Sequence, residues 1–271
     1  MNNNQIAQRP KFSVAMSTEK YKSLINNTLG DPDRARRFSA AITSAVAVNP
    51  ALQECDAGSI LSGALLGESL NLSPSPQLGQ YYLVPYNAKG SVAKKAQFEL
   101  GYKGYIQLAL RSGQYRKLVV SNVKDGELES YDPIQEEIKI NPILDDAERE
   151  AAETIGYYAM FEYINGFRKI MYWSKEKMER HAITYSQGYK AKKGYTFWEK
   201  DFDAMAYKTM LRQLISKWGV MSIDMQNAVA GDGEVIGVGL TPEYVEADEA
   251  DVPDVGSEPI DEVEAVNMDD L

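Results

Sequence analysis

The sequence is poor in the residues that build disulfides, metal sites and membrane spans. It has one cysteine and one histidine. Cys55 cannot form an intrachain disulfide and has no second cysteine or histidine at metal-ligand spacing, so we expect an inert structural thiol. No stretch approaches the roughly 18 apolar residues that span a bilayer, and residues 1–11 lack the apolar centre of a signal peptide. These absences predict a cytoplasmic protein that does not enter a membrane.

Three kinds of catalytic site are also missing. Nucleotide-driven strand exchange needs a phosphate-cradling G-x-x-x-x-G-K-[ST] loop, and the nearest stretch, residues 101–105, has the wrong spacing and carries tyrosines where small residues are needed. The sole histidine, His181, lies in a polar helical stretch beside Arg180, which favours a surface residue over a general base. The densest carboxylates fall in the C-terminal tail, where we expect nothing to hold the geometry of metal catalysis. The sequence therefore predicts a protein that is not an enzyme and has no metal site.

The net charge of −10 hides a segregation of charge along the chain. Residues 231–271 contain 14 Asp and Glu and no Lys or Arg, so residues 1–230 carry 29 basic against 25 acidic side chains, a net of +4. A tail so acidic, with Tyr244 as its single aromatic residue, cannot bury enough surface to fold alone, and we expect it to be disordered. The acidic total does not exclude a nucleic-acid partner.

Helical signals begin after a loose arm over residues 1–16. One amphipathic segment stops at Gly30, a second begins at Asp31-Pro32 and ends before Pro50, and a third begins at Asp56 and ends near residue 73. Further helices are expected near residues 104–111, after Ser174, and over residues 198–218, the longest regular segment.

Strand signals lie between these helices. Residues 81–86 and 96–100 predict a hairpin with a turn at Gly90, and further strands are expected near residues 115–123, 136–140, 156–164 and 167–173. Asn165-Gly166 is the strongest hairpin-turn signal in the chain. The pattern predicts an α+β fold of antiparallel hairpins and sheet with flanking helices. We expect an N-terminal arm and helix over residues 1–30, a folded core over 31–230 and a disordered acidic tail over 231–271.

One block of the core is both basic and aromatic. Between residues 89 and 124 a single acid, Glu99, accompanies eight basic residues: Lys89, Lys94, Lys95, Lys103, Arg111, Arg116, Lys117 and Lys124. Tyrosines are interleaved with them, which suits a groove where cations hold phosphates and rings stack on bases. A solvated face around buried tyrosines is the equally weighted alternative.

A second basic group lies in the long helix. Lys208 and Arg212 share one face, and the positions three and four residues away from each hold no acid. Two like charges stacked in this way are mildly destabilising unless an external anion lies between them, which predicts a phosphate site. Lys217 faces roughly the opposite side, and Lys190, Lys192 and Lys193 form either a flexible clamp or a solvated loop.

Several separated stretches, in order, resemble the RecT family of phage recombinases. They are FELGYKGYIQLALRSGQY (98–115), NGFRK (165–169), YWSKE (172–176), WEKDFDAMAYKTM (198–210) and SKWG (216–219). The resemblance covers about residues 50–225. It implies an ATP-independent single-stranded DNA-binding and annealing protein of homologous recombination and DNA repair, which assembles into rings or helical filaments.

The resemblance also implies partners and site residues. The partners are single-stranded DNA, the annealed duplex, other copies of the chain, an exonuclease that generates single strands, and the single-strand binding protein of the host. No cofactor and no ATP are implied, with Mg²⁺ as an optional stimulant of annealing. Taken with the two basic groups, it places DNA binding at Lys94, Lys95, Lys103, Arg111, Arg116, Lys117, Lys208 and Arg212, with Tyr105 as a stacking residue.

The acidic tail fits that list of partners poorly, because the tip of a host single-strand binding protein is itself acidic. We expect residues 232–271 instead to compete with DNA for the basic groove or to dock a basic partner, with a solubilising tail as the alternative. Three other functions stay open: a sequence-specific double-stranded DNA regulator, a subunit of a nuclease complex and a structural protein of the phage particle. No helix-turn-helix pattern supports the first of these.

Overall fold

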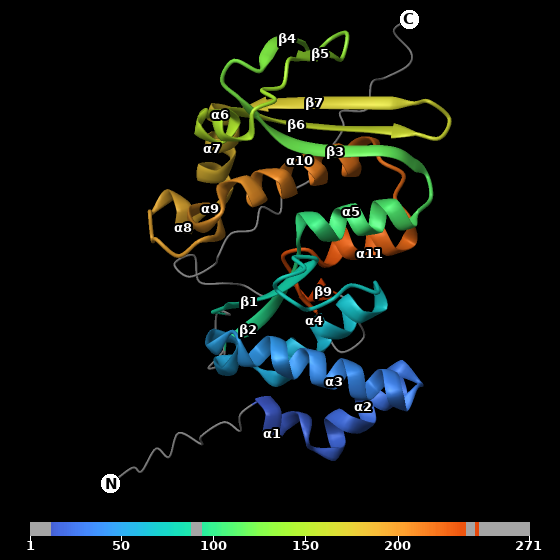
Figure 1. Cartoon of the computed structure of the whole chain (residues 1–271). Helices are drawn as coiled ribbons and strands as arrows, with labels where there is room; N and C mark the ends of the chain where they lie inside the picture. Colours follow the sequence, from blue (N-terminus) through green and yellow to red (C-terminus); the bar gives the residue numbers. More distant parts are fainter. Residues whose placement is uncertain (1–11, 88–93, 237–241, 244–271) are drawn as a thin grey trace, which may run out of the picture.

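A computed structural model describes residues 12–87 and 94–236, and the backbone of residues 242–243 (Figure 1). An N-terminal helical layer comes first. It contains α1 (Phe12–Met16), α2 (Glu19–Leu29), α3 (Pro32–Ala47), the 3-10 helix η1 (Pro50–Glu54) and α4 (Ala57–Ser69). The predicted boundaries hold: Gly30 ends α2 in the left-handed region, and the Asp31 side chain accepts hydrogen bonds from the N–H groups of Asp33 and Arg34 at the start of α3. The arm ends earlier than expected, since Phe12 is already buried against the helices.

The next layer is a small antiparallel sheet of β1 (Tyr81–Tyr86) and β2 (Lys95–Leu100). The predicted hairpin is confirmed as a strand pair, while the turn expected at Gly90 lies outside the described residues. Helix α5 (Tyr102–Arg111) follows β2 directly. Its first turn packs against the backbone of residues 79–80, and a Cβ at Gly104 would lie 2.1 Å from the Gln80 carbonyl oxygen. Glycine is therefore required here for close approach rather than for a phosphate cradle.

A second sheet forms the other side of the molecule. Strands β3 (Tyr115–Lys124), β6 (Thr154–Tyr163) and β7 (Arg168–Ser174) pair antiparallel in the order β3-β6-β7. The predicted turn at Asn165-Gly166 joins β6 to β7, with φ of +88° at Gly166. Between β3 and β6 the chain forms a hairpin of β4 (Leu128–Asp132) and β5 (Glu137–Ile140), then α6 (Asp146–Ala151). The sequence pattern predicts neither β4 nor α6, which bury little apolar surface.

Helices complete the fold. They are α7 (Lys175–Tyr185), α8 (Gln187–Lys190), α9 (Phe197–Lys200), α10 (Phe202–Trp218) and α11 (Ile223–Gly231). The long helix expected over 198–218 is interrupted, because Asp201 leaves the helical region and its side chain caps α10 through the N–H of Ala204. Helix α10 lies between the two layers, against β6 on one side and α5 on the other (Figure 1).

The last described segment belongs to the core. Strand β8 (Val235–Ile236) pairs with β9 (Pro242–Glu243), and the chain before it lies along β2, where the N–H of Phe98 donates to the Glu234 carbonyl. Asp232, Val235 and Ile236 are buried. The folded core thus continues past the predicted boundary at residue 230, since this segment satisfies the open edge of β2. The rest of the predicted tail lies outside the described residues, apart from the backbone of residues 242–243.

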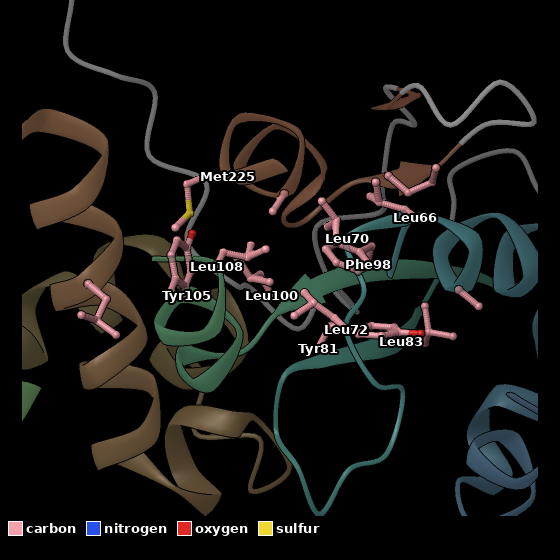
Figure 2. Close-up of a cluster of buried hydrophobic side chains, with 14 of the residues drawn as sticks. Leu66, Leu70, Leu72, Tyr81, Leu83, Phe98, Leu100, Tyr105, Leu108 and Met225 are labelled. Atoms are coloured by element: carbon pink, nitrogen blue, oxygen red, sulfur yellow. The ribbon is translucent and has the colours of Figure 1, made fainter. Parts of the chain in front are cut away.

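The apolar core is continuous from the N-terminal helices to α10. Figure 2 shows its centre, where Leu66 of α4 and Leu70, the residue after that helix, lie near Phe98 and Leu100 of β2. The apolar residues of α4, Ile60, Leu61, Ala64 and Leu65, are all buried. This packing fixes α5 and α10 relative to β1 and β2, and so fixes the surface that these elements share.

Candidate nucleic-acid interface

Three aromatic side chains line a groove between the two layers. Tyr82 and Phe197 border both a cavity of about 90 Å³, which also touches Tyr102, and a wider hollow of about 740 Å³ that runs to α3 and residues 73–77. We call this surface the aromatic groove. Its rings belong to three different elements, β1, α5 and α9, so the groove exists only in the folded chain.

Local structure fixes each ring. Tyr82 lies half-exposed on β1 between the buried Tyr81 and Leu83, as strand alternation requires. Phe197 is the first residue of α9, which starts with a capping box between Thr196 and Glu199. The Tyr82 and Phe197 ring centroids lie 5.9 Å apart. Two adjacent, partly exposed rings form a platform on which bases can stack.

Lysines border these rings. Lys103, exposed at the start of α5, places its ammonium 5.9 Å from the Tyr102 ring centroid, and Lys200, exposed at the end of α9, lies 6.0 Å from that of Phe197. Lys190, Lys192 and Lys193 are exposed in the segment before α9. Cations beside stacking rings are the combination that single-stranded nucleic acids bind. Of the predicted site residues, Lys208 lines the small cavity and Lys103 lies beside Tyr102 at its edge.

Three other predicted residues gather at the far end of α5. Arg111, Arg116 and Lys117 are exposed, about 12 Å or more from Lys103 along the helix. Arg111 donates to the Leu70 carbonyl at 2.9 Å, and Arg116 pairs with Glu162 at 3.2 Å. Lys103 and these three cations therefore form two separate groups.

Lys94 immediately precedes β2 and Lys95 begins it, and both residues are partly exposed. Lys94 forms an ion pair with Glu54 of η1 at 3.0 Å, and both side chains are well exposed, so the pair is weak. Phosphate binding at either lysine stays a prediction.

Lys208 and Arg212 are placed differently from the prediction. Lys208 is only 6% exposed, and its ammonium lies 2.9 Å from Glu99 Oε2 and 2.8 Å from Asp232 Oδ1. Arg212 lies 3.4 Å from Asp232 Oδ2. The anion between these two cations is a carboxylate of the protein itself, so the inference of an external phosphate fails on this geometry. The acids that neutralise them come from β2 and from the segment after α11, which helical spacing cannot show.

The buried charges perturb one another. Burial raises the pKa of Glu99 despite the neighbouring Lys208. For Asp232 burial acts in the same direction, but Lys208 and Arg212 outweigh it and lower the pKa of this carboxyl. Asp232 is therefore ionised and is the main counter-ion of α10. Glu99 Oε1 has no hydrogen-bond partner among the described residues, and Glu99 borders the small cavity.

Tyr105, predicted to stack on DNA, is also buried. Its ring lies in the core beside Leu108 and Met225 (Figure 2), and its hydroxyl donates to Asp232 Oδ2 at 3.2 Å. The predicted stacking role does not fit a side chain with 0% exposure. The tyrosines that line the cavity are Tyr82 and Tyr102, and the sequence pattern predicts only a strand position for Tyr82.

The part of the chain that the structure describes contains no group of three or more His, Cys, Asp or Glu placed to hold a metal. Within the same residues, no helix is both long and apolar enough to cross a membrane. His181, expected at the surface, packs instead against Trp173, Tyr185 and Trp198, and burial lowers its pKa to about 4. Burial also raises the pKa of the Cys55 thiol to about 12, in accord with an inert thiol.

Sequence comparisons identify relatives. Residues 36–250 match the RecT family. The chain is 43% identical over 201 residues to the uncharacterized protein YqaK of Bacillus subtilis, a match that covers 74% of this chain and 65% of YqaK. It is 30% identical over 201 residues to Protein RecT of Escherichia coli, covering 73% of this chain and 71% of that protein. The family match extends over both layers and the aromatic groove, and the chain belongs to the RecT family.

Proposed function

We propose that this chain binds single-stranded DNA in the aromatic groove and anneals it to a complementary strand without ATP. The observation that carries the proposal is the set of three ring side chains bordered by Lys103 and Lys200, in a chain of the RecT family. Rings stack on any base, and lysines bind any phosphate. Neither contact selects a sequence.

Annealing follows from that lack of selection. A protein that holds DNA by backbone and ring contacts leaves base edges free to pair, so Watson–Crick pairing decides which second strand is kept. The protein would hold the two strands side by side and neutralise the phosphate charges that repel them. No bond is made or broken, and the proposed function is therefore not enzymatic.

The partners we propose are single-stranded DNA, the annealed duplex and further copies of the chain. A strand longer than one groove recruits several copies, which gives cooperative binding. The further partners we propose are an exonuclease that exposes single strands and a host single-strand binding protein. The exposed cations at Arg111, Arg116 and Lys117 are proposed as a second phosphate contact.

The test is annealing of two complementary oligonucleotides that carry a fluorophore and a quencher. Purified full-length chain is added with Mg²⁺ and without ATP, over a series of salt concentrations. We expect quenching much faster than the spontaneous rate, and a steep loss of the acceleration as salt rises. A folded chain that binds single strands without accelerating their pairing would contradict the annealing step.

Two controls separate this function from the alternatives. Equal affinity for unrelated single strands is expected, whereas strong preference for one duplex sequence would indicate a regulator instead. End-labelled DNA incubated with the chain and Mg²⁺ is expected to stay intact, and its degradation would indicate a nuclease.

A further inference from the structure

Five large apolar side chains are exposed together at one end of the three-stranded sheet. Ile164 and Phe167 lie in the β6–β7 turn, and the others lie in or beside the connection from α10 to α11. Ile223 is 75%, Ile164 68% and Trp218 51% exposed, and the remaining members are Phe167 and Val220. We call this surface the hairpin end. Isolated exposed apolar residues need no explanation, but a contiguous group of this kind marks an interaction site.

Ordered contacts build the hairpin end. The Tyr163 hydroxyl accepts a hydrogen bond from the N–H of Val220 and donates one to the carbonyl of Trp218. The Phe167 ring stacks on that of Tyr163 with centroids 5.8 Å apart, and the Lys169 ammonium lies 3.6 Å from a Trp218 ring centroid. The surface is thus pre-formed, and binding to it costs little ordering of side chains.

The rim of the hairpin end is mainly basic. Arg168 and Lys217 are exposed beside the apolar residues, and Arg116 and Lys117 lie at the start of β3, which pairs with the end of β6. Three acids lie nearby: Glu162, which is paired with Arg116, Glu136, which is paired with Lys169, and Asp224 in the first turn of α11. A partner for this surface therefore needs apolar contact and negative charge.

The opposite end of the same sheet has that chemistry. Leu144, 88% exposed, precedes α6, and the exposed acids around it are Asp125, Asp145, Asp146, Glu148, Glu150 and Glu153. We call this surface the α6 end. Arg149 anchors it, because its guanidinium binds the buried Glu127 at 2.7 Å and the Asn122 carbonyl at 3.1 Å. Lys175, paired with Glu153, Lys124 and the anchored Arg149 are the cations near it.

These two ends cannot meet within one chain. Strand β6 begins beside α6 and ends at the hairpin turn, so its ten residues separate the two surfaces by about 30 Å. Figure 1 shows α6 and the β6–β7 turn at opposite ends of the sheet. A second copy, however, offers the α6 end to the hairpin end of the first.

We propose that the hairpin end of one copy docks onto the α6 end of the next. Such a contact is heterologous, because each copy uses two different surfaces, and it repeats until it closes as a ring or continues as a helix. The inference deepens the proposed function, since it names the surfaces through which copies would line up along a strand. It does not need DNA in order to be tested.

The test uses full-length chains in which one end is blocked. In the first variant, Ile164→Ser and Ile223→Ser remove apolar contact from the hairpin end without adding charge. In the second, Leu144→Lys and Glu150→Lys place positive charge on the α6 end. All four side chains are exposed, so both variants are expected to fold, which their circular dichroism and thermal unfolding check.

Mass photometry and sedimentation velocity then measure assembly. The unchanged chain is expected to form species larger than dimers as concentration rises, and each variant alone is expected to stay monomeric. An equimolar mixture of the two variants retains one intact hairpin end and one intact α6 end, so it is expected to form dimers and nothing larger. A mixture that stays monomeric, or single variants that assemble as the unchanged chain does, would overturn the proposal.

The outcome is separable from that of the proposed function. Dimers in the mixture, from a chain that does not bind DNA, would support the interface and remove the annealing function. Annealing by the unchanged chain, with no dimers in the mixture, would support the function and remove this interface.

Discussion

The ammonium of Lys208 donates a hydrogen bond to Asp232 Oδ1 across 2.8 Å, inside the protein. Lys208 lies in the middle of α10, and Asp232 immediately follows α11 at the root of the acidic C-terminal region. Helix α10 is thereby joined to the last part of the folded chain. Lys208, which was predicted to bind a DNA phosphate, instead forms buried ion pairs within the core.

Lys208→Ala is expected to cost about 3–5 kcal/mol of unfolding free energy, because it leaves Glu99 and Asp232 buried without their shared cation. Urea unfolding measures the loss. Lys200→Ala, at an exposed lysine of the groove, is the matched control and is expected to change stability by less than about 0.5 kcal/mol while weakening DNA binding. A Lys208→Ala chain of unaltered stability that fails to bind DNA would restore the phosphate role.

Tyr105→Phe removes only the hydroxyl that donates to Asp232. We expect a loss of about 1–3 kcal/mol in unfolding free energy, since the acceptor is a charged, buried group. Affinity for single-stranded DNA, measured by fluorescence anisotropy at a temperature where the variant is folded, is expected to be unchanged. A selective loss of affinity would return Tyr105 to the DNA-binding site.

In contrast to Tyr105, Tyr82 is expected to contribute to DNA binding. Tyr82→Leu keeps an apolar side chain but removes the ring, and it is expected to weaken binding of a short oligonucleotide by about 1–3 kcal/mol. Tyr82→Phe keeps the ring and is expected to bind as the unchanged chain does. Equal affinity of the Leu and Phe variants would exclude stacking at this position.

The salt dependence of binding distinguishes the two groups of exposed cations. Each phosphate contact to a single strand contributes about 0.7 to the slope of log affinity against log salt. Lys103→Ala and Lys117→Ala are each expected to reduce the slope by about that amount. Should Lys117→Ala leave the slope intact while Lys103→Ala lowers it, DNA contacts would be confined to the aromatic groove.

His181 predicts a pH effect on stability. Its pKa is lowered to about 4 in the folded chain by burial, then by Arg212 and Lys177, against about 6.5 when unfolded. The unfolded state therefore binds the proton more readily, and folding weakens as pH falls from about 6.5 to about 4. Relative to His181→Gln, the chain is expected to lose roughly 1–2 kcal/mol over this window, after discounting for partial exposure. Urea unfolding of both chains at pH 7 and pH 4.5 checks it, and parallel curves would contradict it.

Local signals predicted the elements of this fold well. The Asn165-Gly166 turn, the Asp31 cap and the Gly30 terminus each depend on a few adjacent residues, and each lies where expected. The RecT family relationship was likewise visible in separated sequence stretches.

The candidate site was predicted less well, for a physical reason. Lys208 is neutralised by residues 109 and 24 positions away, so a search of the helical neighbours at three and four residues finds no acid. Asp232 was hidden among the carboxylates of a tail expected to be disordered. The burial of a side chain also depends on residues that are distant in the sequence. Tyr105 is interleaved with cations in the sequence but lies in the core, whereas Tyr82 faces the groove.

The segment after α11 also determines when β2 can complete its contacts while the chain is being synthesised on the ribosome. Leu100 of β2 donates its N–H to the Asp232 side chain, a contact that spans 132 residues. At translation rates of about 5–20 residues per second, β2 waits roughly 7–26 s for this partner to be synthesised. During that interval the nascent chain carries an open strand edge, the kind of surface that exposes a folding chain to wrong pairing until its last folded residues emerge.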